Sequence, residues 1–374
     1  MQRRKFLQIG AGTLGLSLLA PSFSFANEAN DTRFIFIIQR GAADGLNIVI
    51  PYADPNYRNI RKELAIENGN KLDGTFALHP ALQNIYQLYL QKQASFVHAT
   101  ASPYRERSHF DGQNILEGGF TRAYELDNGW LNRFIGIIPK QKSEPIAFMQ
   151  TIPLAMRGTN SVTSYAPSNI PDANEDLMMR ISNLYENDAK LYDLWLKAEA
   201  TRNMGQSISG QGAAAVGKMV GSFLAKPDGP RIAMIESQGW DTHSGQNNRL
   251  NGNLKDIDTA IGAMKTELGD AWGKTIIIIA TEFGRTAHAN GTGGTDHGTA
   301  SCAMILGGKI EGGKVHTDWP GLAQSSLYEG RDLKPTTDLF GVISYYLGKG
   351  FNIEPQKVAQ NIFAQVPNVK MFNA

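Results

Sequence analysis

The sequence predicts an α/β protein with a doubly wound, mostly parallel sheet flanked by helices, plus a helical insertion. The first observation is a run of four isoleucines in Thr275–Ala280, which is typical of a strand buried on both faces. The second is that this run and at least two others end abruptly in loops that carry charged side chains. The third is that predicted strands alternate with predicted helices, as they do in doubly wound folds.

Apolar runs of strand length set the predicted sheet. The main strands are predicted at residues 33–39, 95–98, 231–236, 275–280 and 301–306, with a short strand at 146–149. Ligands of open α/β sheets bind beyond the carboxyl ends of the strands. The loops that follow these runs are therefore the places where we expect a functional site.

Helices are predicted between these strands. Residues 80–90 follow a proline start, and residues 110–117 end at two glycines. Residues 247–268 carry apolar side chains at steps of three or four, as an amphipathic helix does. Residues 172–224 show helical spacing without strand signals and are predicted to be an insertion near the mouth of the site, where they would shape substrate choice. A last helical region is expected from Thr337.

The first 26 residues are predicted to be an export signal, and the folded domain to comprise residues 27–374. Arg3 and Arg4 precede Phe6-Leu7, a short apolar run follows, and Ser24–Ala26 is a small-x-small cleavage site. The apolar run is too short to be a permanent membrane helix. We therefore expect the twin-arginine translocase as a partner during export, and a periplasmic or extracellular mature protein.

Charge and apolar length limit the other partners. Removal of residues 1–26 would lower the formal net charge from +1 to −2, because three basic residues and no acidic residue are lost. A near-neutral chain offers no electrostatic case for binding nucleic acid or an anionic membrane surface. No later segment has 18 uninterrupted apolar residues, so no stable membrane span is expected. Cys302 is the only cysteine; it is interpreted as a small core residue.

Loops after the second and third strands carry candidate chemistry. Ser108 begins a predicted helix, where its hydroxyl can cap the helix or attack an anionic group held at the positive helix terminus. Asp241 and His243 follow the third strand, and an Asp-x-His pair can bind a divalent cation. The alternative is an N-cap aspartate and a surface histidine.

The loops after the first and fourth strands add more charged groups. Asp44 lies beside Gly45 and is either a site carboxylate or part of an Asp-Gly turn. Glu282 ends the fourth strand, and Arg285 is positioned to clamp an oxyanion. Asp296 and His297 follow in a Gly-rich loop that lacks the Lys-Ser/Thr of a phosphate-binding Walker loop. Four further histidines are interpreted as structural, superficial or poorly placed: His79, His98, His288 and His316. Of these, His98 stays open as a site residue, because it ends the second strand.

These blocks resemble the bacterial DUF1501 family of exported proteins, which is grouped within the alkaline phosphatase-like superfamily. The resemblance rests on the twin-arginine start and on five blocks: 40–45, 108–114 with 117–119, 239–243, 281–285 and 294–297. It spans nearly the whole mature chain. It implies an alkaline phosphatase-like α/β fold with metal ligands at strand ends and a nucleophile at a helix start.

The resemblance also implies roles for individual residues. Ser108 matches the nucleophile, Asp44 the first metal-binding aspartate, Asp241 and His243 the Asp/His pair, Glu282 the aspartate of the Asp-His pair, and His297 the final histidine. Phe283 departs from the pattern, because it stands where the histidine of that Asp-His pair belongs. One metal, an altered pair that uses Asp296 or His288, or an inactive site are the possible consequences.

Two functions follow from this interpretation. The first is an exported metal-dependent hydrolase of phosphate or sulfate esters, or a related transferase, on a small molecule or a glycan. Ser108 would attack, and Arg40, Arg107 or Arg285 would hold the anion. Mixed Asp, Glu and His ligands do not choose among zinc, manganese, calcium and magnesium. The second is a non-catalytic cell-envelope protein of the same fold that binds a glycan or a secretion partner, which Phe283 favours.

Overall fold

A computed structural model describes residues 31–166, 175–205 and 212–369. The chain from Asp31 onward forms one compact unit. The predicted signal, residues 1–26, lies outside the described residues. Within the described part of the chain, no helix is long and apolar enough to cross a membrane.

One nine-stranded sheet organises the fold, in the order β11-β5-β10-β9-β1-β8-β6-β7, with β12 paired to β5. Its strands are β1 (Arg33–Gln39), β5 (Ala94–Ala101), β6 (Ile146–Ala147), β7 (Thr163–Ser164), β8 (Ile232–Ser237), β9 (Thr275–Thr281), β10 (Ser301–Leu306), β11 (Val315–His316) and β12 (Thr337–Asp338). β1 pairs in parallel with both β8 and β9, whereas β10 is antiparallel to β5 and β9. The predicted mostly parallel sheet is therefore confirmed.

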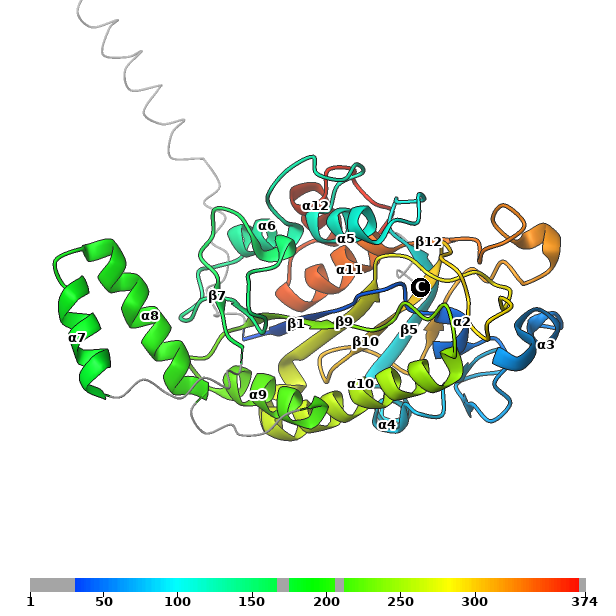
Figure 1. The fold of residues 1–374 in the computed structure, drawn as a ribbon, viewed down its shortest axis with the longest axis horizontal. Helices are drawn as coiled ribbons and strands as arrows, with labels where there is room; N and C mark the ends of the chain where they lie inside the picture. Colours follow the sequence, from blue (N-terminus) through cyan, green and yellow to red (C-terminus); the bar gives the residue numbers. More distant parts are fainter. Residues whose placement is uncertain (1–30, 167–174, 206–211, 370–374) are drawn as a thin grey trace, which may run out of the picture. The chain divides into compact units, whose positions relative to one another are not determined.

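Helices cover both faces of this sheet (Figure 1). They are α4 (Gln83–Leu90), α5 (His109–Gly118), α6 (Trp130–Ile137), α9 (Ala213–Ala225), α10 (Gln246–Leu268), α11 (Leu339–Phe351) and α12 (Pro355–Ile362). Alternate residues of β1 point to opposite faces. Phe34 and Phe36 pack with α5, α6, α11 and α12, whereas Ile35 and Ile37 pack with α4, α9 and α10. The doubly wound architecture follows from this two-sided burial.

A smaller unit lies beside the carboxyl end of β1. It comprises α2 (Gly45–Ile48), α3 (Tyr57–Arg61) and a three-stranded sheet of β2 (Val49–Ile50), β4 (Ala77–Leu78) and β3 (Asn70–Lys71). Its apolar side chains, which include Leu46, Ile50 and Tyr57, form a separate buried cluster.

The described parts of the predicted insertion form helices, but these helices do not all lie in the same part of the fold. It contains α7 (Glu175–Tyr185), α8 (Ala189–Gly205) and α9. α9 belongs to the layer on the sheet and packs closely along α10, since a Cβ at Gly217 would lie 2.1 Å from the carbonyl oxygen of Ala260.

The two remaining helices of the predicted insertion lie away from the predicted site. In α8, Lys197 Nζ pairs with Glu144 Oε1 at 2.8 Å. Glu144 lies two residues before β6, which runs parallel to β8, so this contact is at the amino ends of the strands. The predicted place near the mouth of the site is therefore wrong, because ligands of such sheets bind at the opposite, carboxyl ends.

Candidate metal centre

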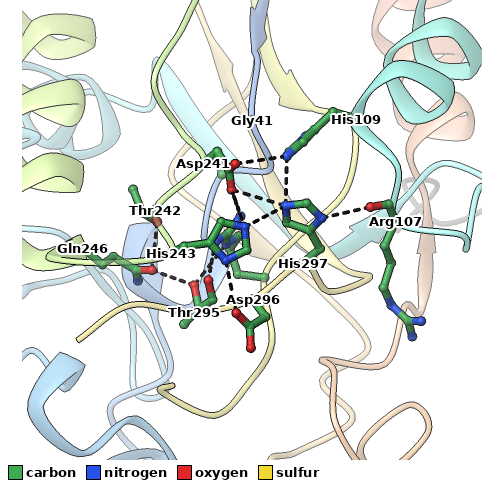
Figure 2. Close-up of polar contacts among 12 residues, drawn as sticks. Gly41, Arg107, His109, Asp241, Thr242, His243, Gln246, Thr295, Asp296 and His297 are labelled. Carbon is green, nitrogen blue, oxygen red and sulfur yellow. Dashed lines mark hydrogen bonds and ion pairs between the residues drawn. The ribbon is translucent and has the colours of Figure 1, made fainter. Parts of the chain in front are cut away.

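Side chains from three segments meet beyond the carboxyl ends of β8 and β9. The loop after β8 carries Asp241 and His243, the loop after β9 carries His297, and α5 begins at His109 (Figure 2). The β9 loop folds back on itself, since Thr286 N donates to the Asp296 carbonyl at 2.9 Å. Expected site residues that are far apart in sequence are thereby brought together at the expected edge of the sheet.

The Gly-rich part of the β9 loop holds the backbone of His243. Thr292 Oγ1 and Asn290 Nδ2 donate to the His243 carbonyl at 2.6 and 2.9 Å. A Cβ at Gly294 would lie 2.4 Å from that same carbonyl oxygen, so only glycine permits the approach. The loop thus holds the backbone of His243 in place.

Three imidazoles converge with one carboxylate (Figure 2). His297 Nε2 lies 3.0 Å from His109 Nε2 and 3.0 Å from His243 Nε2. Asp241 Oδ1 lies 3.3 Å from His297 Nε2 and 3.0 Å from His243 Nε2, and Asp241 Oδ2 lies 3.5 Å from His109 Nε2. His109, Asp241 and His297 therefore each place one ligand atom within 4.8 Å of the other two, and His243 joins this group through His297 and Asp241.

The second nitrogen of each of these histidines has its own acceptor. His109 Nδ1 donates to Glu282 Oε1 at 2.9 Å, and His243 Nδ1 donates to Asp296 Oδ1 at 3.1 Å. His297 Nδ1 donates to the carbonyl oxygen of Arg107 at 3.0 Å. Since carboxylates and carbonyls only accept, each Nδ1 carries a proton and the Nε2 lone pairs face the common point. This is the arrangement in which histidines bind metals.

The donor set fits a single metal ion. Zinc binds nitrogen and oxygen ligands at about 2.0–2.2 Å in a tetrahedron, which places the ligand atoms roughly 3.3–3.5 Å apart. The five separations given above between neighbouring nitrogen and oxygen atoms, 3.0 to 3.5 Å, match this spacing to within a few tenths of an ångström.

Two carboxylates at the cluster, Asp241 and Glu282, are held in their ionised form. Partial burial alone would raise the pKa of Asp241, but the hydrogen bond and charge of Arg285 outweigh it and hold the pKa below its usual value. Burial would likewise raise the pKa of Glu282, but hydrogen bonds from His109, Gln113 and the Gly41 backbone lower it. Both carboxylates are therefore ionised at neutral pH.

Three of the six predicted metal ligands take part directly: Asp241, His243 and His297. Glu282 instead accepts from Gly41 N, His109 Nδ1 and Gln113 Nε2 on one oxygen and from Thr281 Oγ1 on the other. Asp296 Oδ1 accepts from His243 Nδ1. The structure therefore places Glu282 and Asp296 behind the histidines, where they orient the rings.

Asp44 is not brought into this cluster. Its Oδ2 forms a buried ion pair with Arg61 Nη2 and accepts from Gln246 Nε2 at 2.5 Å, and its Oδ1 caps α2 through Leu46 N. The side chains of Asp44 and Arg61 are both essentially inaccessible to solvent. Both of its oxygens accept from groups of the fold, so we assign it a structural role in place of the predicted metal role.

The three arginines expected to hold an anion are engaged in ion pairs. Arg285, with no exposed side-chain surface, donates through Nη1 to Asp241 Oδ1 at 2.6 Å and through Nε to Thr295 Oγ1 at 3.1 Å. Arg40 pairs with Glu117 and Glu236, and Arg107 with Asp332 and Glu329. Arg285 is therefore a positioning residue for Asp241, and the predicted oxyanion clamp is not formed.

His109 is the site residue that sequence reasoning missed. It lies next to Ser108, the predicted nucleophile, and at the first position of α5. Ser108 is the N-cap of α5, but its hydroxyl makes no capping hydrogen bond. Gln113, four residues after His109, contacts Glu282 from the same face of the helix. That spacing, on a predicted helix that begins at the edge of the sheet, was the available signal.

Phe283 forms the apolar wall of the centre. Its ring stacks on His109, with centroids 5.1 Å apart and an interplanar angle of 24°, and lies 5.4 Å from the ring of His297. The residue that breaks the expected Asp-His pair thus packs against two imidazole rings of the cluster. His288 is exposed, and among the described residues it makes no hydrogen bond or ion pair with the cluster.

His98 and Cys302 are structural residues. His98 is fully buried, its Nε2 donates to the Val49 carbonyl at 2.8 Å, and its Nδ1 accepts from Ala99 N at 2.7 Å. Burial lowers the pKa of His98 to about 4, so the ring is neutral. Cys302 is buried in β10, and burial raises the pKa of its thiol far above its usual value.

Solved structures of the alkaline phosphatase superfamily are similar to this chain at low identity. A superfamily protein from Vibrio parahaemolyticus is 11% identical with a TM-score of 0.38, and the match covers 76% of this chain but 63% of that protein. The alkaline phosphatase from the Antarctic bacterium TAB5 is 13% identical with a TM-score of 0.38, covering 75% and 93% of the two chains. The C-terminal periplasmic domain of EcEptC from Escherichia coli, in complex with Zn, is 10% identical with a TM-score of 0.42, covering 92% of each.

These TM-scores lie below 0.5, and the similarity carries no argument about activity. No curated protein matches the sequence. The family model described as "Protein of unknown function (DUF1501)" matches residues 31–363. With the motifs and the strand-end cluster in place over that span, the chain belongs to the DUF1501 family.

Proposed function

We propose that this protein is a hydrolase of phosphate or sulfate esters that depends on one metal ion. The observation that carries the proposal is the convergence of His109, Asp241 and His297, whose ligand atoms lie within 4.8 Å of one another, with His243 beside His297 and Asp241. Imidazole donors suit zinc, whereas calcium, magnesium and manganese suit oxygen ligands. Of the four metals left open by the sequence, we therefore assign zinc.

The centre is accessible enough for a substrate to reach it. The side chains of His243 and Asp241 are 46% and 42% exposed, whereas Glu282 and Arg285 behind them are buried. A bound metal would polarise an ester oxygen and stabilise negative charge that develops there. The protein's part is to hold the ligand rings by Glu282, Asp296 and the Arg107 carbonyl, and to fix Asp241 by Arg285.

Ser108 is the proposed nucleophile. It directly precedes the ligand His109, and its hydroxyl is not used to cap α5. The first-turn N–H groups of a helix lack intrahelical acceptors and favour an anion. Attack by Ser108 Oγ on phosphorus or sulfur would break the bond to the ester oxygen, which leaves with a proton. Water then releases phosphate or sulfate and restores the hydroxyl.

We further propose that the protein is exported by the twin-arginine translocase and acts outside the cytoplasm. Arg3 and Arg4 before Phe6-Leu7 support this route. The Arg3→Lys/Arg4→Lys double variant is expected to stay in the cytoplasm with its signal uncleaved, as seen by cell fractionation. Unchanged export of this variant would refute the route.

Turnover of small aryl esters tests the catalytic proposal. Zinc-loaded protein is assayed with 4-nitrophenyl phosphate, 4-nitrophenyl sulfate and bis(4-nitrophenyl) phosphate. Ser108→Ala should lower kcat by several powers of ten and retain zinc, because the Ser108 hydroxyl makes no capping hydrogen bond whose loss would disturb α5. His243→Ala should instead weaken zinc binding.

The control is Ser325→Ala, at an exposed serine outside the centre. It should match the wild type in turnover and in zinc content. If wild-type protein binds no metal after native export and hydrolyses none of the three esters, the hydrolase proposal is refuted. That outcome would favour the non-catalytic envelope protein.

A further inference from the structure

A groove of about 710 Å³ runs along α5 beside the metal centre. We call it the α5 groove and define it by six of its lining residues: Phe110, Asn114, Tyr124, Gln150, Glu236 and Gln238. Its volume lies within the range of about 300–1,000 Å³ that is typical of ligand sites. None of the four groups that converge at the metal centre lines it.

α5 connects the groove to the metal centre. Residues four apart lie on one face of a helix, one above the other. His109 and Gln113 form the row that meets Glu282, as their hydrogen bonds of 2.9 and 3.1 Å show. Phe110 and Asn114 form the adjacent row and line the groove. A molecule in the groove would therefore lie next to the ligand His109.

Two aromatic side chains of the groove are exposed to solvent. Phe110 is 80% exposed and Tyr124 is 66% exposed. Exposed aromatic rings in a groove indicate a binding surface, because burying them against a ligand is favourable. Tyr124 also has a φ of 60°, which is unfavourable for a bulky residue. Its backbone N donates to Asn114 Oδ1 at 2.6 Å, so the groove itself holds this conformation.

The polar lining of the groove is rich in amides and balanced in charge. Gln150 and Gln238 join Asn114, and Gln238 Nε2 donates to Glu236 Oε1 at 2.9 Å. The charged lining residues are two arginines and two glutamates, Arg40, Arg157, Glu117 and Glu236, whose formal charges cancel. Arg40 pairs with both glutamates at 2.8 Å. Such a lining gives a polyanion no general attraction but offers many uncharged donors and acceptors.

We propose that the α5 groove binds a carbohydrate chain and presents an ester on that chain to the metal centre. The faces of a sugar ring carry C–H groups that pack on the negative face of an aromatic ring, and its rim carries hydroxyl groups that bond to amides and carboxylates. Aromatic rings, amides and cancelled charges together match this chemistry. The inference that the carbohydrate is an ester substrate rests on the proposed hydrolase function.

Binding of defined oligosaccharides tests the groove without requiring catalysis. Cellohexaose, maltohexaose, chitohexaose and mannohexaose are titrated into the full-length mature protein by calorimetry. We expect at least one of them to bind. Phe110→Ala and Tyr124→Ala should each weaken that binding about tenfold, since each removes one stacking ring. Phe110→Leu should resemble Phe110→Ala, because leucine lacks the flat face, and Phe110→Trp should restore binding.

The matched control is Leu184→Ala, at a 73% exposed apolar residue of α7. It should bind the oligosaccharide like the wild type. The groove proposal is overturned if none of the four hexasaccharides binds, or if binding is insensitive to both Phe110→Ala and Tyr124→Ala. Oligosaccharide binding without any ester hydrolysis would refute only the hydrolase proposal. Hydrolysis of aryl esters without oligosaccharide binding would refute only the groove proposal.

Discussion

Glu282→Gln should weaken metal binding without disturbing the fold. Glu282 Oε1 accepts from Gly41 N, His109 Nδ1 and Gln113 Nε2, and Oε2 accepts from Thr281 Oγ1. Glutamine can keep its oxygen at the first position and donate its NH₂ to Thr281 Oγ1. The Thr281 proton then goes to the Gln39 carbonyl, which is already 2.8 Å away. The substitution therefore removes a negative charge while the hydrogen bonds are retained.

The loss of this charge lowers the basicity of His109 as a ligand. Removal of such a partner typically weakens metal affinity by about 10- to 100-fold, which corresponds to roughly 1.4–2.7 kcal/mol. Zinc affinity is measured at pH 7.5 by competition with a chromophoric chelator, and folding by thermal unfolding. Glu117→Gln is the control, because Glu117 is also buried and pairs with Arg40 but contacts no ligand histidine. Equal zinc affinities for the two variants would refute the role assigned to Glu282.

Three further outcomes are expected from buried groups. Asp44→Asn should lower the free energy of unfolding in urea by about 3 kcal/mol, because Arg61 is left without its buried partner, and zinc stoichiometry should not change; loss of zinc would restore Asp44 as a ligand. Phe283→Ala should lower the free energy of unfolding by about 3–5 kcal/mol by opening a cavity beside His109, and a change below 1 kcal/mol would contradict its packing role. Stability should fall as the pH is lowered from 6.5 to 4, because burial holds the pKa of His98 at about 4 while an unfolded histidine titrates near 6.5. The unfolded chain therefore binds more protons in this window, and urea midpoints that are equal at pH 7 and pH 5 would contradict this account.

Much of the sheet could be predicted because its signals are local. The four isoleucines of β9 and the apolar run of β1 are long enough to be recognised as buried strands. Strand direction has no such signal, so the antiparallel pairing of β10 was not predicted. α9 is separated from α7 and α8 because it packs against α10. Residue spacing within 172–224 could not reveal this, since α10 lies outside that segment.

The place of the site was predictable, whereas the roles of its members were only partly so. Asp241, His243 and His297 follow strand ends, as a ligand set in an α/β fold should. Glu282 has the same sequence context, yet its side chain accepts four donors behind His109. Asp44 turns toward Arg61, a partner 17 residues away that no motif indicates. Side-chain direction and distant pairing decided these roles, and neither is encoded in local spacing.

The central claim is a single metal ion held by three histidines and one aspartate. An anomalous difference map from crystals of protein exported through its native pathway, recorded above and below the zinc edge, tests it most directly. We predict one zinc peak, bonded to His109, His243 and His297 Nε2 and to the Asp241 carboxylate. A second metal peak, a peak ligated by Asp44 or Glu282, or no peak between the three imidazoles would contradict the account.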